Sequence, residues 1–235
     1  MCELLPGRIQ GLWFTLSQAS PVLYVTPRDK HTIAFPSLPL TMQLLLLFPM
    51  IIGGQEARPH SRPYMAFVKI QREGKGGNIC GGFLIREDVV VTAAHCNCNL
   101  GDKAELTQTV GTIPLSQKKV KKGAVCSVAG WGQTSIKTNA QPSPTLQEVE
   151  LTVMSKSMCL SQPILHYVPS RMLCVGDPQQ RKFAFQGDSG GPLVCDGKAQ
   201  GIVSHGTGDW STPSVFTRLS KYVCWIKNTL HKLKP

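Results

Sequence analysis

Long apolar runs are missing from this sequence. The most apolar stretch, Leu44–Phe48, is stopped by Pro49, whereas a transmembrane helix needs about 20 consecutive apolar residues. Acidic residues are scarce, with 14 Asp and Glu against 25 Lys and Arg, and only 17% of the residues are charged. These shortages exclude a membrane bundle, an acidic disordered tail and a coiled coil. The sequence also has no internal repeat and no N-glycosylation sequon.

Glycine, proline and cysteine are abundant instead. The 235 residues include 22 Gly, 17 Pro and 9 Cys, and 42% are apolar, a composition typical of one or two globular domains with a sizeable core. Frequent turns favour short strands over long helices. The cysteines indicate an oxidising compartment with disulfides, and their odd number leaves at least one thiol without an intramolecular partner. This composition fits both a disulfide-bonded enzyme and a basic binding protein.

Residues 1–50 differ from the rest of the chain. They carry three basic and two acidic residues, so +10 of the net charge of +11 belongs to residues 51–235. The apolar run at 44–48 is shorter than the 7–15 residues of a signal-peptide core and lies forty residues into the chain. Two interpretations stay open: a degenerate secretory signal near Met42 behind unrelated sequence, or a leader without function. We expect a leader of unclear role at 1–50 and a functional domain at 51–235.

Short β-prone segments follow from residue 51, separated by Gly, Pro and Ser. Their close spacing predicts antiparallel β structure, in a barrel or a sandwich, and no helical pattern alternates with them. The C-terminus differs, because apolar residues from Tyr222 to Leu233 fall at helical spacing with lysines between them. The expected strands are Tyr64–Ile70, Gly82–Ile85, Val89–Thr92, Ala124–Ala129, Leu146–Val153, Pro192–Cys195, Gln200–Ser204 and Ser214–Thr217.

The stretch Gly187–Leu193, with the sequence GDSGGPL, carries the most chemical information. A serine hydroxyl is a weak nucleophile that needs a neighbouring base and donors for the developing oxyanion. Glycines on both sides of Ser189 let the backbone approach a substrate and aim its N–H groups at that oxygen. A candidate base is His95, in the sequence VTAAHC at 91–96. Each segment alone is more often structural, but together they predict a nucleophile and its base.

Four motifs stand in an order typical of chymotrypsin-fold serine proteases. They are IIGG at 51–54, TAAHC at 92–96, VAGWG at 128–132 and GDSGGPL at 187–193. The segments EARPHSRPYMA at 56–66, CSVAGWG at 126–132 and LQEV at 146–149 resemble more closely the branch of granzymes, cathepsin G and mast-cell chymases. The resemblance covers nearly all of residues 51–235 and none of residues 1–50. It implies an all-β protein with two antiparallel six-stranded barrels and a C-terminal helix.

The resemblance implies a serine endopeptidase that works through an acyl-enzyme, with no cofactor. Ser189 is the implied nucleophile, His95 is the base, and the backbone N–H groups of Gly187 and Ser189 form the oxyanion hole. Asp188 is expected to be buried, where a carboxylate is costly without a cationic partner. In this family the partner is the ammonium of a new amino terminus that cleavage of the chain creates. Here cleavage after Met50 would free the ammonium of Ile51, so the uncut chain is expected to be a zymogen.

The same alignment pairs six of the nine cysteines. The implied disulfides are Cys80–Cys96, Cys126–Cys195 and Cys159–Cys174, each typically worth about 2–4 kcal/mol. Cys2, Cys98 and Cys224 are left over. Because Cys96-Asn97-Cys98 offers too few ligands for a zinc site, no metal is expected.

The alignment with the family also implies which residues line a substrate pocket. Since no acid lies among them, cleavage after Lys or Arg lacks a counter-charge, and we expect a preference for hydrophobic residues of medium size. His205 stands where the family usually has an aromatic residue. This departure from the family pattern lies where the substrate backbone is expected to dock. The implied lining residues are Phe183, Ala184, Phe185, Ser204, His205, Gly206 and Ser214.

The third member of the family's triad, an aspartate in an Asn-Asp-Ile-like strand, is not found. Between residues 97 and 125 the only acids are Asp102 and Glu105, in surroundings that resemble the segment after the triad strand. Compared with the family, roughly forty residues are missing, so a truncated first barrel (51–103) is expected before the second barrel and helix (104–235).

Loss of this acid is expected to impair catalysis. Without it the imidazole loses its tautomer and orientation, which lowers kcat about 10⁴-fold in the family's template case. Asp102 lies seven residues after His95, a span of roughly 23 Å when extended, but nothing in the sequence positions it as a substitute.

Two groups of lysines remain, one at 118–122 (Lys118, Lys119, Lys121 and Lys122) and one on the terminal helix. Positive charge of this size attracts polyanions, and the resemblance implies secretion or granule storage with sulfated glycosaminoglycans. No nucleic-acid motif accompanies it. Two hypotheses follow. One is a granzyme- or chymase-type endopeptidase acting on polypeptides; the other is a catalytically silent, polyanion-binding protein on the same scaffold.

Overall fold

The computed structural model describes residues 51–72, 75–96, 104–136, 140–162, 164, 166–176, 182–207 and 213–232, with the backbone alone for residues 71, 72 and 75–77. The leader at 1–50, Cys98 and Asp102 lie outside this part of the chain. In the described ranges, no helix has the length and apolar character required to cross a membrane.

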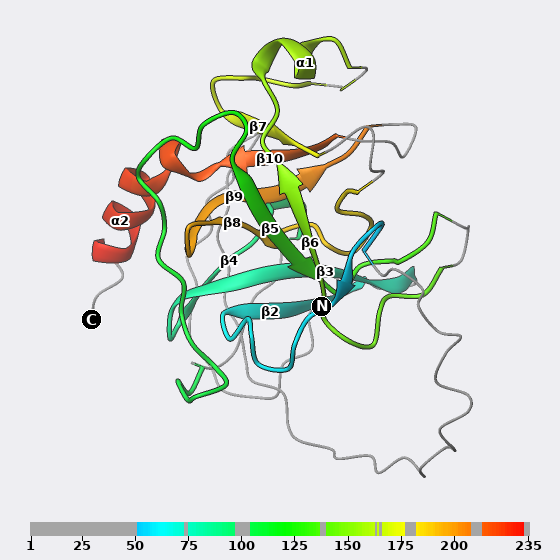
Figure 1. The fold of residues 1–235 in the computed structure, drawn as a ribbon. Coiled ribbons are helices and arrows are strands. Elements are labelled where there is room, and N and C mark those ends of the chain that lie inside the picture. Colours follow the sequence, from blue (N-terminus) through cyan, green and yellow to red (C-terminus); the bar gives the residue numbers. More distant parts are fainter. Residues whose placement is uncertain are drawn as a thin grey trace.

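The described chain is mostly β, with a curled seven-stranded sheet, a three-stranded sheet and two α-helices (Figure 1). The first strands are β1 (Gln55–Glu56), β2 (Met65–Arg72), β3 (Lys75–Arg86) and β4 (Val89–Val91). The later strands are β5 (Val125–Gly130), β6 (Gln147–Thr152), β7 (Met172–Val175), β8 (Pro192–Cys195), β9 (Lys198–His205) and β10 (Ser214–Arg218). The helices are η2 (Ala94–Cys96), α1 (Lys156–Leu160), η3 (Leu219–Lys221) and α2 (Val223–Lys232).

The larger sheet forms a barrel in the order β6-β5-β8-β9-β10-β7, and β1 adds to the outer edge of β6. The sheet curls until its ends meet at the bridge between Val153 and Val175. There the Met154 amide donates to the Cys174 carbonyl (3.0 Å) and the Gly176 amide donates to the Thr152 carbonyl (3.0 Å). Alternate side chains fill the interior, as strand periodicity requires. The buried core includes Val128, Leu151, Leu173, Leu193, Val203 and Phe216.

The first half of the fold has three paired strands in the described ranges, in the order β2-β3-β4. Within these ranges the first barrel is therefore incomplete, in agreement with the truncated barrel expected from the missing residues. Residues 104–116 lie along this sheet instead, because the Ala104 amide donates to the Glu87 carbonyl (2.7 Å) and the Ile113 amide donates to the Leu84 carbonyl (2.9 Å). The same segment, green in Figure 1, then passes α2 and enters the larger sheet at β5.

The terminal helix forms where its periodicity predicts. Val223 and Ile226 on α2 are buried, and Tyr222 and Leu230 pack against the same core cluster. Leu233, the last apolar residue of the pattern, lies outside the described residues.

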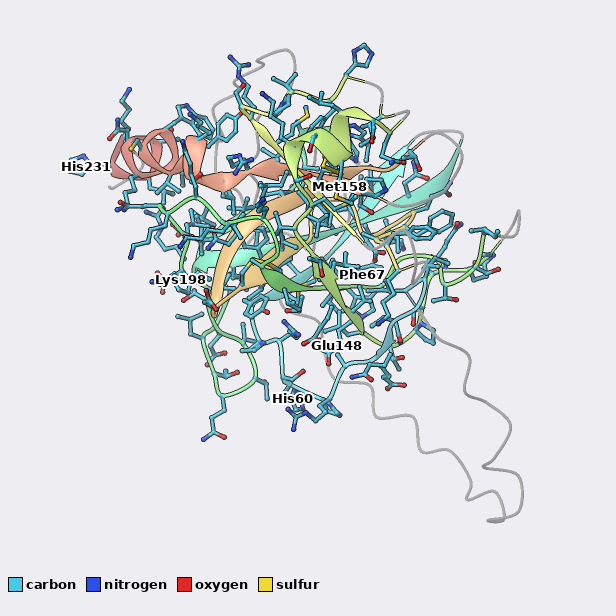
Figure 2. All side chains as sticks on the ribbon, turned by 45° about the horizontal axis from the view of Figure 1, so that its top comes forward. His60, Phe67, Glu148, Met158, Lys198 and His231 are labelled. Atoms are coloured by element: carbon cyan, nitrogen blue, oxygen red, sulfur yellow. A yellow bond between two sulfur atoms is a disulfide. The ribbon has the colours of Figure 1, made fainter. Side chains whose placement is uncertain are left out.

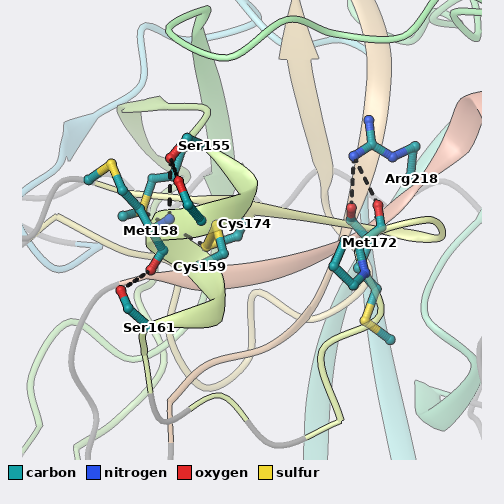
Figure 3. Close-up of a disulfide and its surroundings, with 10 residues drawn as sticks. Ser155, Met158, Cys159, Ser161, Met172, Cys174 and Arg218 are labelled. Carbon is teal, nitrogen blue, oxygen red and sulfur yellow. Dashed lines mark hydrogen bonds between the residues drawn. A yellow bond between two sulfur atoms is a disulfide. The ribbon is translucent and has the colours of Figure 1, made fainter.

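Within the described residues, three disulfides join Cys80 to Cys96, Cys126 to Cys195 and Cys159 to Cys174, the pairs that the resemblance implied. Cys224 is a free, exposed cysteine. The last of the disulfides ties α1 to β7 (Figure 3). The Ser155 hydroxyl caps α1 by accepting from the Met158 amide (3.2 Å).

Candidate active site

Ser189 lies on a tight loop that enters β8, and two glycines with positive φ shape this loop. Gly187 has φ +98° and Gly190 has φ +90°, values that favour glycine because it has no Cβ. A Cβ on Gly190 would also overlap the hydroxyl of Thr92 and the carbonyl of Gly81. The spacing of glycines in GDSGGPL is thus required by both the turn and its close packing.

His95 lies on η2, a single helical turn that follows β4. Its neighbour Cys96 is fully buried and is bonded to Cys80 on β3. A ring nitrogen of His95 and the two cysteine sulfurs all lie within 4.8 Å of one another. Because both sulfurs are used in the disulfide, this cluster does not have the thiolates that a metal site of this kind needs.

Both catalytic candidates are fixed to the same point on β3. The Gly81 amide donates to the Ser189 carbonyl (2.8 Å), and the Thr92 hydroxyl donates to the Gly81 carbonyl (2.7 Å). The residue before Gly81 is Cys80, which holds η2 and His95 through its disulfide. The structure therefore brings His95 and Ser189 together from parts of the chain 94 positions apart, although no hydrogen bond joins their side chains in the described ranges.

The environment of His95 lowers its pKa. His95 is solvent-exposed as a whole, but the protein around part of its ring displaces water and disfavours the imidazolium, which is the main cause, and the positive charge of His205 adds to the effect. The His205 Nδ1 atom lies 3.1 Å from the Ser204 hydroxyl, with which it shares a hydrogen bond. No carboxylate of a described residue contacts His95. The ring is therefore biased toward its neutral form, which is the form that accepts a proton.

Asp188 is fully buried directly before Ser189. Its Oδ1 atom accepts from the Gly132 amide (2.8 Å) and its Oδ2 atom accepts from the Phe185 amide (2.8 Å). Burial raises the pKa of Asp188 to about 6, although both hydrogen bonds act to lower it. No cation of a described residue pairs with this carboxylate.

Glycines make room for the Asp188 carboxylate, a role that the sequence analysis missed. A Cβ on Gly132 would lie 2.5 Å from Oδ1, and a Cβ on Gly130 would overlap the same oxygen. The signal was present in the sequence, because Gly130-Trp131-Gly132 belongs to a motif that was noted only for the family resemblance.

Ile51 is already buried in the core of the larger sheet while its bond to Met50 is intact. The Phe183 amide donates to the Ile52 carbonyl (3.2 Å), which ties this segment to the strip before Asp188. Ile51 has φ +63°. This left-handed conformation is strained for a β-branched residue.

The expected pocket residues lie on three segments, at 183–185, at 204–206 and at Ser214. Phe183, Ala184 and Phe185 are buried, and the rings of Phe183 and Phe185 pack edge to face with centroids 5.9 Å apart. The Ser214 hydroxyl donates to the Ala184 carbonyl (3.4 Å). Ser204 and His205, at the end of β9, are half-buried, and Gly206, the residue after the strand, is exposed.

Known proteins are similar in sequence to most of this chain. The sequence model of the trypsin family matches residues 51–104 and 97–226. Mast cell protease 3 of Ovis aries is 44% identical over 231 residues, covering 78% of this chain and 90% of the relative. Granzyme B of Rattus norvegicus is 41% identical over 229 residues (77% and 92%), and cathepsin G of Homo sapiens is 39% identical over 249 residues (83% and 96%).

A solved structure described as "Structure of GrC" superposes with a TM-score of 0.71 at 36% identity, covering 77% of this chain and all of that one. Together with the four ordered motifs, these likenesses leave one assignment. The chain belongs to the trypsin family of serine proteases, in the branch that contains the granzymes, cathepsin G and the mast-cell chymases.

Proposed function

We propose that this chain is the zymogen of a serine endopeptidase with Ser189 as nucleophile and His95 as general base. The observation that carries this proposal is the shared anchor on β3, where Cys80 holds the histidine turn and Gly81 holds the serine loop. A nucleophile and its base must be brought within hydrogen-bond reach, and such bonds often tighten only when substrate binds.

The proposed reaction has two stages. The Ser189 oxygen attacks the scissile carbonyl carbon while His95 takes its proton, and the N–H groups of Gly187 and Ser189 bind the oxyanion. His95 then gives the proton to the leaving amine, which leaves an acyl-enzyme that water hydrolyses. The lowered pKa of His95 supports this role, because a neutral ring is the base.

Cleavage after Met50 is the proposed activating step. It creates an ammonium at Ile51, and this cation supplies the partner that buried Asp188 lacks in the uncut chain. Since Asp188 directly precedes Ser189, its orientation sets the direction of the oxyanion-hole amides.

We infer a preference for hydrophobic residues before the cleaved bond. Support comes from the apolar strip at 183–185 and from the absence of a charged side chain among the seven pocket residues other than the ionisable His205. A substrate Lys or Arg would lose its hydration there without gaining a counter-charge.

The missing triad aspartate is proposed to weaken catalysis in this chain. The trypsin-family match is split into two parts that overlap at 97–104. The alignment with mast cell protease 3 spans 231 positions, whereas 78% of 235 residues is about 183, so about 48 aligned positions have no counterpart here. A deletion of that size supports the loss of the strand that carries the acid.

A fluorophosphonate probe tests this function after residues 46–50 are replaced by an enterokinase site that exposes Ile51. Covalent labelling that disappears in Ser189→Ala is expected, at a rate far below that of a complete family member. Absence of labelling in a sample with a cooperative thermal transition would overturn the enzymatic proposal.

A polyanion-binding role on the same scaffold is the second candidate, and exposed lysines favour it. Lys118, Lys119, Lys121 and Lys122 are all exposed. The neighbouring β9 begins with exposed Lys198, which lies on the same side of the molecule as His231 of α2 (Figure 2). Secretion or granule storage with sulfated glycosaminoglycans would suit this surface. Retention on immobilised heparin at moderate salt tests it, and elution with the void volume at low salt would refute it.

A further inference from the structure

Arg62, on the loop between β1 and β2, is bound to the β5–β6 hairpin by its whole guanidinium group. Its Nε and Nη2 atoms both lie 3.0 Å from Glu148 Oε2, and Nη1 donates to the Ser127 hydroxyl (2.8 Å) and the Tyr64 hydroxyl (3.0 Å). The Arg62 and Glu148 side chains are only 18% and 20% exposed, so solvent screens the pair less than a surface ion pair. Glu148 is labelled in Figure 2.

The partners of Arg62 lie where the N-terminal segment attaches to the larger sheet. Glu148 on β6 is paired with Gln55 on β1, and the next pair joins Gln147 to Glu56. Beyond β1, the Ala57 amide donates to the Leu146 carbonyl (2.9 Å). The segment that begins at Ile51 therefore meets β6 at Glu148, the residue that Arg62 binds, and continues beside β6 to Ala57.

Among the described residues, the segment between Ile51 and Ala57 is held to the rest of the chain by few backbone contacts, namely the Phe183 amide on the Ile52 carbonyl and the short pairing of β1 with β6. β1 is two residues long, and both of its side chains are exposed, so its pairing gains almost nothing from apolar burial. Next to it, Gly53 and Gly54 line a cavity of about 230 Å³ together with Arg62, Glu148 and Lys182. A segment that borders open space and carries exposed side chains depends on polar contacts for its position.

We propose that Arg62, acting through Glu148, positions the new amino terminus beside Asp188. This inference deepens the proposed function, because it rests on the Ile51–Asp188 ion pair as the activating contact. The Arg62–Glu148 pair holds the segment from Gly53 to Glu56 in the register that places Ile51 in the core. Arg62 is thus a positioning residue, which touches neither substrate nor the reacting atoms.

The test measures burial of the Ile51 amine, so it does not require catalysis. The full chain with the enterokinase site at 46–50 is cut, treated with cyanate at pH 7, and followed by mass spectrometry for carbamylation of the Ile51 α-amine. The ε-amine of exposed Lys198 serves as the internal reference. We expect the amine of the unsubstituted protein to be protected, and Arg62→Met to raise its carbamylation rate about tenfold, equivalent to about 1.4 kcal/mol.

Matched variants separate positioning from general loss of stability. Arg86→Met removes a half-buried ion pair with Asp88 elsewhere on the first sheet, and should leave the Ile51 rate within twofold. Glu148→Gln should act like Arg62→Met, and it provides the same test if Arg62→Met does not fold. Arg62→Lys, which keeps the charge, should restore most of the protection.

Two results would overturn the inference. One is an unchanged Ile51 rate in folded Arg62→Met or Glu148→Gln, and the other is an equal rise in Arg86→Met. If the unsubstituted amine reacts as fast as in Asp188→Asn, both the activating ion pair and its positioning by Arg62 are wrong. Protection of the amine without fluorophosphonate labelling, in contrast, contradicts only the proposed catalysis.

Discussion

The buried carboxylate of Asp188 should make the stability of the uncut chain depend on pH. Its pKa in the folded chain is about 6, above the ordinary value of 3.8, because burial disfavours the charged form. The folded state therefore holds a proton that the unfolded state releases between these values. The resulting stability is fully present below about pH 3.8 and is lost as the pH rises through 6.

The size of this effect follows from the two pKa values. The difference between 3.8 and about 6 corresponds to about 3 kcal/mol in total. Between pH 5.0 and 7.5, where the folded chain deprotonates and the unfolded chain is already ionised, linkage gives a loss of about 1.4 kcal/mol. For a domain of this length, that loss lowers Tm by roughly 3–6 °C.

Guanidinium unfolding of the uncut chain at pH 5.0 and 7.5 measures this loss. In Asp188→Asn the side chain stays neutral, so the change in unfolding free energy between the two pH values should be smaller than in the unsubstituted chain by about 1.4 kcal/mol. Asp196→Asn, which alters an exposed carboxylate, is the matched control and should leave the change unaltered. Equal pH dependence in Asp188→Asn and the unsubstituted chain would refute the reasoning.

Three further perturbations have expected outcomes. Gly190→Ala places a methyl group against the Thr92 hydroxyl at a positive φ. Thermal unfolding should show a loss of stability of about 2–4 kcal/mol, and gel fluorescence should show that fluorophosphonate labelling is abolished. Replacing both Cys80 and Cys96 by Ser opens a disulfide with a sequence separation of 16. Denaturant unfolding should show a loss of stability of about 3 kcal/mol, and fluorophosphonate labelling should fall by more than the amount of folded protein does. Changing the four lysines at 118–122 to Gln removes exposed positive charge. The protein should then elute from heparin at a lower salt concentration, with Tm altered by no more than about 2 °C. Unchanged elution would contradict a polyanion-binding surface at these lysines.

Much of the fold was predictable because side-chain alternation and turn residues are local signals. The expected strands at 124–129, 192–195 and 214–217 correspond to β5, β8 and β10 within one residue. Sequence reasoning missed β7, because this four-residue strand is specified by pairing with β10 about forty residues later rather than by its own periodicity. It also missed α1, whose five residues are too few for a helical repeat, although Ser155 is a capping signal.

The site was predictable only through motifs. Periodicity places Ser189 and His95 on loops, but it does not indicate that both loops attach at Cys80–Gly81, because that contact joins distant parts of the chain. The burial of Asp188 and its two amide donors was equally hidden, since desolvation depends on the packed structure. Local sequence could not reveal the network around Arg62, because only Tyr64 is a near neighbour and the partners on the larger sheet, Ser127 and Glu148, lie 65 and 86 positions away.

The left-handed conformation of Ile51 has a consequence for the reversibility of activation. The angle φ of Ile51 is defined by the carbonyl carbon of Met50, so hydrolysis of that peptide bond removes the strained torsion itself. Strain of about 1–3 kcal/mol would have to be restored if the bond were resealed, which shifts the ligation equilibrium roughly 5–150-fold toward the cut chain. The uncut chain stores this bias in one backbone angle, so maturation is expected to proceed in one direction.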